Sequence, residues 1–173
     1  MTSPSLVVSD TSPLCNLARL GWLDWLKRRF GKVWIPEAVA SELGIWTHVE
    51  GARLLRHAME DGWLEIRRIT DANALASLPN WIHQGEKEAI LLPENLNASY
   101  LLMDDRDGRA VAEARHLSVV GEVGMVLWVK ESGQIESVTD ALRRLREEAR
   151  FFISPKLEYQ AIASAGEGES CDS

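Results

Sequence analysis

Residues 101–109 read LLMDDRDGR, and in this stretch an apolar segment runs directly into acidic residues. The apolar run 99–103 predicts a buried strand, and 107–116 predicts a helix with Asp107 as its N-cap. Three carboxylates, at positions 104, 105 and 107, therefore lie where the strand gives way to the helix. A turn rarely needs so much negative charge, which suggests that some of these acids have a chemical role.

The rest of the chain alternates in the same way between short apolar runs and amphipathic segments. The predicted strands are 5–10, 32–35, 63–69, 99–103 and 117–121. The predicted helices are 13–20, 22–30, 36–43, 48–60, 83–92, 107–116, 124–132, 137–149 and 155–164, with a short helix and a loop in 71–80. This alternation predicts an α/β fold with a largely parallel sheet covered on both faces. We expect a single domain over residues 1–164 and a disordered tail over 165–173.

Proline positions predict three of the helix boundaries. Ser12 before Pro13 is a suitable N-cap for the first helix, and Ser154 before Pro155 for the last one. Pro93 is expected to stop or kink the helix that begins at residue 83, because proline lacks the amide proton that a helix interior needs.

Composition limits the classes of protein that the chain can belong to. With 173 residues and a hydrophobic fraction of 46%, it can bury one sizeable core. No apolar run reaches the roughly 20 residues of a membrane span, and Cys15 and Cys171 suggest neither a disulfide framework nor a zinc site, so a cytoplasmic location is expected. The net charge of −7 disfavours a broad non-specific nucleic-acid binder.

Acidic residues follow two of the predicted strands at their carboxyl ends. Asp10 comes directly after the first strand, and Asp104 and Asp105 come after the strand 99–103. The carboxyl ends of parallel strands lie at one edge of a sheet, where the chemistry of such folds is found. These acids can therefore converge.

Two glutamates lie on the apolar sides of their predicted helices. Glu42 shares a side of its helix with Ala38 and Val39. Glu86 precedes Ala89 and Ile90 by three and four residues, so it lies on the apolar side of its own helix. A carboxylate there is costly unless it is paired or bound to a cation. Glu88 also shares a face with apolar residues, so spacing alone does not choose between Glu86 and Glu88.

Several carboxylates held close together repel one another, and a hard divalent cation such as Mg²⁺ or Mn²⁺ resolves this repulsion. Each acid also has a purely structural alternative. Asp10 can cap the first helix, Glu42 can lie half-exposed at a helix end, and Asp104 or Asp105 can be a turn residue paired with Arg106 or Arg109.

Four segments together resemble the PIN domain. They are VVSDTSPL at 7–14, VWIPEAVASEL at 33–43, GEKEAI at 85–90 and LLMDDRDGRAVAEARHLSVVGEVGMVLWVKESGQI at 101–135. The likeness is to short prokaryotic PIN-like proteins related to VapC-type toxins of toxin–antitoxin pairs. It implies a three-layer α/β/α fold with a parallel sheet of four or five strands.

The resemblance also implies an activity, namely an Mg²⁺- or Mn²⁺-dependent endoribonuclease. Carried over position by position, the catalytic acids are Asp10, Glu42, Glu86 and Asp105, and these acids together with Asp104 are the implied metal ligands. Glu86 stands where many relatives have aspartate, and the assignment between Asp104 and Asp105 stays open. Ser12, Arg106 and Arg109 are weaker candidates for substrate contact, and surface pairing with Asp107 or Glu113 is the alternative for the two arginines.

The partners follow from the same resemblance: an RNA substrate, an antitoxin protein and a second copy of the chain, with no membrane. A rival hypothesis is a catalytically weak PIN-fold module that acts by binding an antitoxin or RNA, and another is a structure-specific DNA nuclease. Of the seven tryptophans, most are expected to pack in the core or in a dimer contact, and Trp46 and Trp81 lie near turns and near the proposed acidic helices.

Overall fold

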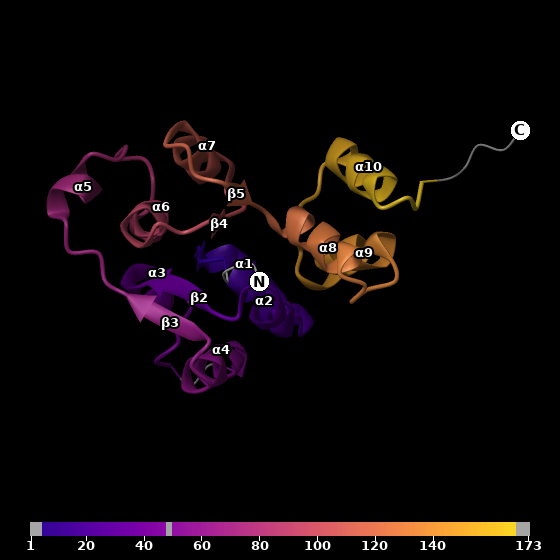
Figure 1. Cartoon of the computed structure of the whole chain (residues 1–173), viewed down its shortest axis with the longest axis horizontal. Helices are drawn as coiled ribbons and strands as arrows, with labels where there is room; N and C mark the ends of the chain where they lie inside the picture. Colours follow the sequence, from indigo (N-terminus) through magenta and orange to yellow (C-terminus); the bar gives the residue numbers. More distant parts are fainter. Residues whose placement is uncertain (1–4, 48–49, 169–173) are drawn as a thin grey trace, which may run out of the picture. The chain divides into compact units, whose positions relative to one another are not determined.

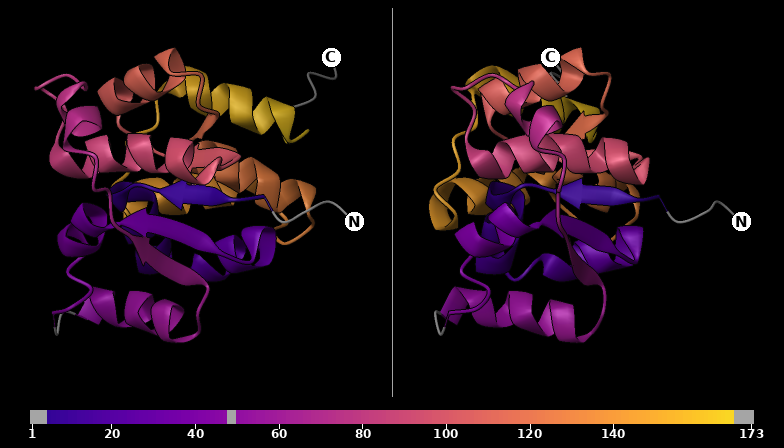
Figure 2. Two further views of the ribbon diagram at one scale, coloured as in Figure 1. Left: turned by 60° about the vertical axis from the view of Figure 1, so that its left-hand side comes forward. Right: turned by 90° about the vertical axis from the view of Figure 1, so that its left-hand side faces the viewer.

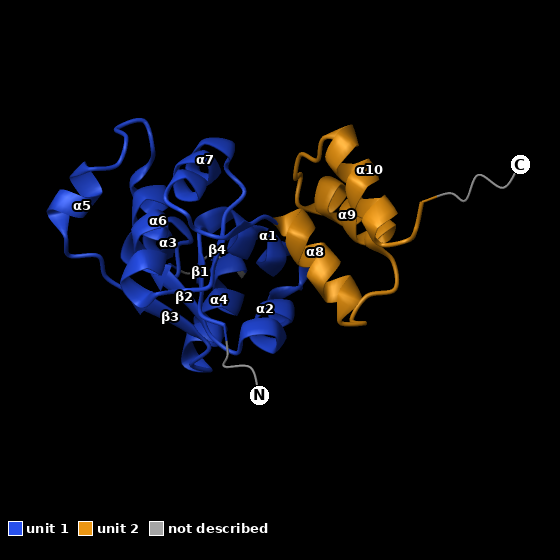
Figure 3. Ribbon diagram, turned by 45° about the horizontal axis from the view of Figure 1, so that its top comes forward, with its two compact units in different colours: residues 1–121 blue, residues 122–173 orange. Residues whose placement is uncertain are grey.

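A computed structural model describes residues 5–47 and 50–168. The chain divides into two compact units, Met1–Gly121 and Glu122–Ser173 (Figure 3). The first unit contains every strand and the second unit is helical. The expected single domain over 1–164 stays a prediction, and the two units are described separately below.

The first unit contains a five-stranded parallel sheet, as the sequence predicts. Its strands are β1 (Val7–Ser9), β2 (Val33–Pro36), β3 (Leu64–Arg67), β4 (Tyr100–Leu102) and β5 (Val119–Val120). Their order is β3-β2-β1-β4-β5, and every neighbouring pair is parallel (Figure 1). The fold is therefore α/β of the three-layer, PIN-like kind.

Helices cover the sheet because parallel strands need crossover connections. They are α1 (Thr11–Leu20), α2 (Leu23–Phe30), α3 (Glu37–Glu42), α4 (Glu50–Glu60), α5 (Ala72–Ala76), α6 (Gln84–Leu96) and α7 (Arg106–Ala114). Right-handed crossovers put α1, α2 and α4 on one face, since β1, β2 and β3 follow one another across the sheet. The chain then returns past β1 to β4, so α6 and α7 cover the other face, and α6 runs beside the strands (Figure 2).

The central pairing of β1 with β4 brings two distant segments to one edge of the sheet. Ser9 is the register partner of Leu102, and the Asp10 amide donates to the Leu102 carbonyl over 2.9 Å. Residue 10 and residues 103–105 therefore leave the sheet side by side.

In the first unit, two helices begin earlier than predicted. The helix α1 starts at Thr11 with Asp10 as its N-cap, so Ser12 lies inside the first turn and is not the cap. The helix α7 starts at Arg106 with Asp105 as its N-cap, so the prediction of Asp107 is wrong. Asp10 comes directly after β1, whereas Asp105 is the third residue after β4, and in both cases an acid takes the cap position.

Pro93 does not stop its helix, because α6 continues to Leu96. Proline removes one backbone hydrogen bond, and here it does so near the end of the helix. The last turn is closed by Asn97 in the left-handed conformation, with its amide donating to the Glu94 carbonyl, and by the Ala98 amide, which donates to the Pro93 carbonyl over 2.8 Å.

The second unit consists of α8 (Glu122–Glu131), α9 (Val138–Glu148) and α10 (Pro155–Ser164). Ser154 caps α10 through the Leu157 amide, with Pro155 in the first turn, as the sequence predicts. Glu167 lies in the expected disordered tail, yet its carboxylate accepts hydrogen bonds from the Val138 and Thr139 amides at 2.7 and 2.9 Å. Residues 169–173 of that tail lie outside the described residues.

Within the described ranges, no helix is both long enough and apolar enough to cross a membrane.

We expect Glu167→Ala to destabilise the helical unit by about 1–2 kcal/mol, because it removes the carboxylate that caps α9. Burial raises the pKa of Glu167, but hydrogen bonds from the Thr139 and Val138 amides and from the Lys130 and Thr139 side chains outweigh burial and lower it to about 2. A lowered carboxyl pKa stabilises the fold above the ordinary value of 4.5, and that stabilisation is lost as pH falls towards 2. Urea unfolding at pH 7 and pH 2.5 should therefore show a difference between wild type and variant that shrinks in acid.

The control for this measurement is Glu158→Ala, which removes an exposed ion pair with Arg146 on the same unit. An exposed pair contributes little, so its effect should stay within about 0.5 kcal/mol. Equal destabilisation by the two variants would contradict the capping role of Glu167.

Candidate acidic active site

Asp10 is the centre of the candidate site. Its residue is only 4% exposed, and although it occupies the N-cap position of α1, its side chain makes no capping hydrogen bond. Burial raises the pKa of Asp10 to about 7, the Thr11 amide opposes this, and the carboxylates of Glu86, Glu42 and Asp105 raise it further. Four carboxyl groups from four separate segments therefore lie within electrostatic range of one another.

Glu42 reaches this site from the end of α3. The sequence places it on a buried stripe, but it is the last residue of its helix and is exposed, so that expectation is wrong and its half-exposed alternative is nearer. Its Oε2 accepts a hydrogen bond from the Thr11 hydroxyl, which fixes the carboxylate beside Asp10. The environment of Glu42 is therefore set by a contact across 31 residues of sequence, not by the periodicity of α3.

Gly85, in the first turn of α6, allows the approach of Glu42. A methyl group built on Gly85 would lie 2.2 Å from Glu42 Oε1 and 2.9 Å from Oε2. Glycine is unfavourable inside a helix by up to about 1 kcal/mol, so its presence indicates a need for space. The space is used by a carboxylate.

The structure separates Glu86 from Glu88. Glu86 is half-buried, and its Oε2 accepts from the His83 amide at 3.0 Å. Burial raises the pKa of Glu86, the amide and charge of His83 lower it, and Asp105 and Glu42 raise it. Glu88 instead accepts from the Ala38 amide at 3.1 Å, so it holds the start of α3 and not the acidic site.

Asp104 and Asp105 also have different surroundings. Asp105 Oδ1 accepts from the Asp107 and Gly108 amides, each at 2.9 Å, and its charge acts on Asp10. Asp104 is half-buried and lies against Gly121, where a built methyl group would meet Asp104 Oδ1 at 2.7 Å and the Arg109 guanidinium at 2.9 Å. Asp105 is therefore the better candidate for the acidic site.

The three candidates for substrate contact differ in how they are held. Arg109 donates to the Met103 carbonyl over 3.0 Å and lies 3.6 Å from a Glu113 carboxylate oxygen, which is the structural alternative for this residue. Arg106 is exposed in the first turn of α7, and Ser12 is exposed in the first turn of α1. Of these three candidates, Arg106 and Ser12 are exposed and Arg109 is half-buried.

The acids suit a hard divalent cation in their chemistry. Carboxylate oxygens are the ligands that Mg²⁺ and Mn²⁺ prefer, and mutual repulsion around a buried Asp10 favours a counter-charge. Among the described residues, however, no three acidic, histidine or cysteine side chains are drawn together as a ready ligand set. Each of the other three carboxylates, those of Glu42, Glu86 and Asp105, accepts a hydrogen bond through one oxygen. The side chains would therefore have to move toward Asp10 to hold a cation together with it.

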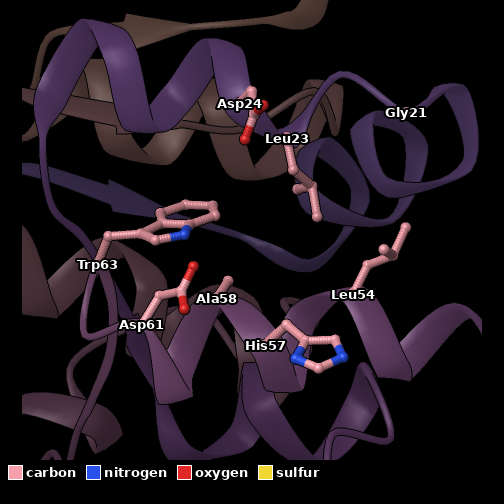
Figure 4. Close-up of a pocket in the computed structure, with 8 residues that line it drawn as sticks. All are labelled: Gly21, Leu23, Asp24, Leu54, His57, Ala58, Asp61 and Trp63. Atoms are coloured by element: carbon pink, nitrogen blue, oxygen red, sulfur yellow. The ribbon is translucent and has the colours of Figure 1, made fainter.

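A pocket elsewhere on the first unit contains other titratable groups. Asp24, His57 and Asp61 line it together with Trp63 (Figure 4). Trp63 precedes β3 and Gly21 ends α1, so the pocket lies at the amino edge of the sheet, away from the acids. The Asp61 carboxylate is already paired with Lys27 at 3.5 Å.

Comparisons with known proteins give a family and a structural likeness. A family model described as a PIN domain matches residues 6–167. The solved structure of a PilT N-terminus domain protein from the hyperthermophilic archaeon Sulfolobus solfataricus P2 is 19% identical in sequence, with a TM-score of 0.49, and the match covers 67% of this chain and 86% of that chain. A search of curated proteins found no match.

We expect the metal-free protein to lose stability as pH rises from about 4 to about 7. The folded chain holds the Asp10 proton more tightly than the unfolded chain does, so this contribution is fully present below 3.8 and is lost as pH passes about 7. Asp10→Asn should remove this pH dependence and stabilise the metal-free protein at pH 8 by up to about 4 kcal/mol. Urea unfolding in EDTA across this pH range measures both effects.

Asp24→Asn is the matched control, since Asp24 is an exposed aspartate in the first turn of α2. It should retain the pH dependence of the wild type. Parallel stability curves for wild type and Asp10→Asn would show that Asp10 is not under electrostatic stress.

We expect Gly85→Ala to weaken Mn²⁺ binding roughly 10-fold or more while changing stability little. The added methyl group meets the flexible end of the Glu42 side chain, which can swing away at small cost but then leaves the site. Calorimetric titration measures the metal affinity, and thermal unfolding measures the stability.

The control is Gly51→Ala, because Gly51 is also the second residue of its helix, and a methyl group there meets nothing within 4 Å. That variant should bind Mn²⁺ as the wild type does. If both variants bind equally well, the close approach of Glu42 to Gly85 does not matter for the metal.

Proposed function

The chain belongs to the PIN-domain family, and on this premise we propose that it is a cytoplasmic endoribonuclease that requires Mg²⁺ or Mn²⁺ and acts as the toxin of a toxin–antitoxin pair. PIN domains are generally nucleases, which supports the hydrolysis of a nucleic-acid phosphodiester bond. The proposal assigns RNA as the substrate and Asp10, Glu42, Glu86 and Asp105 as the acidic set.

One observation carries the proposal. Buried Asp10 lies within electrostatic range of three carboxylates from other segments of the chain, and the Thr11 hydroxyl holds one of them, that of Glu42, beside it. Such an arrangement costs folding free energy and is found where it serves a site. A helix cap or a surface ion pair would not need it.

The roles of the residues follow from their contacts. Asp10, Glu42, Glu86 and Asp105 would hold the cation, with Asp10 at the base of the site because it is the buried member. A bound divalent cation supplies charge neutralisation at the phosphoryl oxygens and lowers the pKa of water.

The remaining contacts orient these acids. The Thr11 hydroxyl holds one oxygen of Glu42 and leaves the other facing the α6 helix. The Asp107 and Gly108 amides hold Asp105 in the same way. Metal-free Asp10 retains a proton near neutral pH, so cation binding is coupled to proton release at its carboxyl group.

The alternative is a catalytically weak PIN-fold module that binds an antitoxin or RNA. One observation favours it: among the described residues, no three acidic, histidine or cysteine side chains are drawn together as a ready ligand set. Calorimetry with Mn²⁺ separates the two, since a degenerate site should bind the ion weakly.

The antitoxin, the toxin role and the homodimer rest on the resemblance to VapC-type toxins. Co-purification with the product of a neighbouring gene tests the first two, and light scattering of the purified chain tests the third. A monomer at micromolar concentration would contradict the homodimer while leaving the nuclease proposal intact.

Incubation of the purified protein with RNA is the direct test of the activity. We expect cleavage with Mg²⁺ or Mn²⁺, and a loss of at least about 10²-fold in Asp10→Asn and Glu42→Gln, the size seen when one electrostatic group of an active site is removed. Cleavage products resolved on a denaturing gel give the rates.

Glu94→Gln is the control, because Glu94 lies in α6 but pairs with Arg115 at 2.7 Å. It should cleave at the wild-type rate. Cleavage that persists in EDTA, or equal cleavage by Asp10→Asn and wild type, would defeat the proposal. A DNA strand of the same sequence, at one salt concentration, distinguishes a deoxyribonuclease.

A further inference from the structure

Two of the seven tryptophans are exposed, and both lie on the surface of the first unit. Trp46 is 61% exposed and Trp81 is 62% exposed. The other five are buried or half-buried, namely Trp22, Trp25, Trp34, Trp63 and Trp128. Leaving an indole in water forgoes a large hydrophobic gain, so two such residues on one unit need an explanation.

The exposure of Trp46 is imposed by the backbone around it. Its neighbour Ile45 is 1% exposed and anchors the loop in the core. Arg56 donates to the Ile45 carbonyl over 3.2 Å and also to the Thr47 carbonyl, and the Thr47 amide closes a turn onto Gly44 at 2.8 Å. Both sides of Trp46 are thus fixed, and its side chain is directed outward.

Trp81 is presented in the same way. Its neighbour Ile82 is 4% exposed, and the Ile82 amide donates to the Pro79 carbonyl at 3.2 Å. Leu78 is also buried, so the loop is held on both sides of the tryptophan. Two separate loops therefore pair one buried apolar anchor with one exposed indole.

Both tryptophans are close in sequence to residues that meet at the acidic site. The Glu42 carboxylate touches the position of Gly85, as the built methyl contact of 2.2 Å shows. Trp46 follows Glu42 by four residues, and Trp81 precedes Gly85 by four residues. Four residues span at most about 14 Å between Cα atoms, so each indole is within reach of the acids.

We propose that Trp46 and Trp81 form a stacking surface for the unpaired bases of single-stranded RNA bound at the acidic site. The proposal rests on the proposed function, and it names the substrate class as unpaired RNA. Aromatic side chains bind bases without regard to sequence, because every base has a stacking face.

Electrostatics explain why this chain needs such a surface. Its net charge is −7, and the acids at the site repel phosphates until a cation is bound. This repulsion opposes the lysine and arginine contacts that supply most of the affinity in many nucleic-acid binders. Stacking is independent of that charge, so the affinity should fall less steeply with salt than it does for a basic protein.

The test is binding of a fluorescently labelled single-stranded RNA in Mg²⁺, followed by anisotropy, with every variant made in the Glu42→Gln background, where cleavage should be slowed at least about 10²-fold. We expect Trp46→Ala and Trp81→Ala each to weaken binding by about 5- to 150-fold, which corresponds to 1–3 kcal/mol per stacked base. Trp46→Phe and Trp81→Phe should retain part of the affinity. The same sequence as a duplex should bind more weakly, because its bases are not available.

Leu54→Ala is the control, since Leu54 is a large apolar residue of the same unit that is 41% exposed but lines the pocket at the amino edge of the sheet. It should bind like the wild type. The phenylalanine variants also guard against misfolding, and thermal unfolding of every variant shows whether it is folded.

The outcomes separate this inference from the nuclease proposal. Binding that depends on the tryptophans but without cleavage overturns the nuclease and supports the stacking surface. If RNA is cleaved but both alanine variants bind it as the wild type does, the stacking surface alone is overturned. The stacking surface is also overturned if single-stranded RNA does not bind at all, or if the duplex binds more tightly. Loss of self-association in the alanine variants with unchanged RNA affinity would identify a protein contact instead, and would also overturn it.

Discussion

A buried carboxylate at the seam between two parallel strands is the constraint on which the rest of the structure depends. The hydrogen bond from the Asp10 amide to the Leu102 carbonyl fixes residue 10 beside the end of β4, so Asp10 and Asp105 cannot avoid each other. The fold tolerates this because the sheet on either side is apolar and fully buried, with Val7, Val8, Leu101 and Leu102 each at most 1% exposed. Stability supplied by the strands is thus partly offset by charge at their ends, as is usual where a site is built into a fold.

The junction between α3 and α6 extends that constraint to the glutamates. Glu88 holds the start of α3 through the Ala38 amide, and Gly85 leaves room for the carboxylate at its end. Two neighbouring turns of α6 therefore position one short helix at both ends. This arrangement explains why the acidic set includes a residue from a six-residue helix, which would be poorly defined by its own hydrogen bonds.

The sequence is sufficient to predict the sheet but not the finer assignment of the acids. Short apolar runs with a carboxylate at the end predict the strands and their acidic edge, and the family match confirms the resemblance to PIN domains. Periodicity could not choose between Glu86 and Glu88, because both faces of α6 are covered and the choice depends on which neighbour lies opposite. Periodicity also placed Glu42 on the buried side of α3, and this prediction was wrong. Glu42 is the last residue of the helix, and the point at which α3 ends is decided by the chain that follows. Thr11 and Gly85 were overlooked as contacts of Glu42, although a glycine inside a predicted helix was a usable signal.

Charge and shape at this edge lead to one further consequence. A polyanion approaching four carboxylates is repelled, and the repulsion weakens as counter-charge enters, so cation binding and substrate binding must favour each other. Because the acids oppose the attraction that basic residues supply, groups that carry no charge would add to the affinity for the substrate. Trp46 and Trp81 are the large apolar side chains that the two loops beside the acids expose. The proposed nuclease would therefore select unpaired nucleic acid through its bases, and the phosphate contacts would be left to the cation and to arginines such as Arg106.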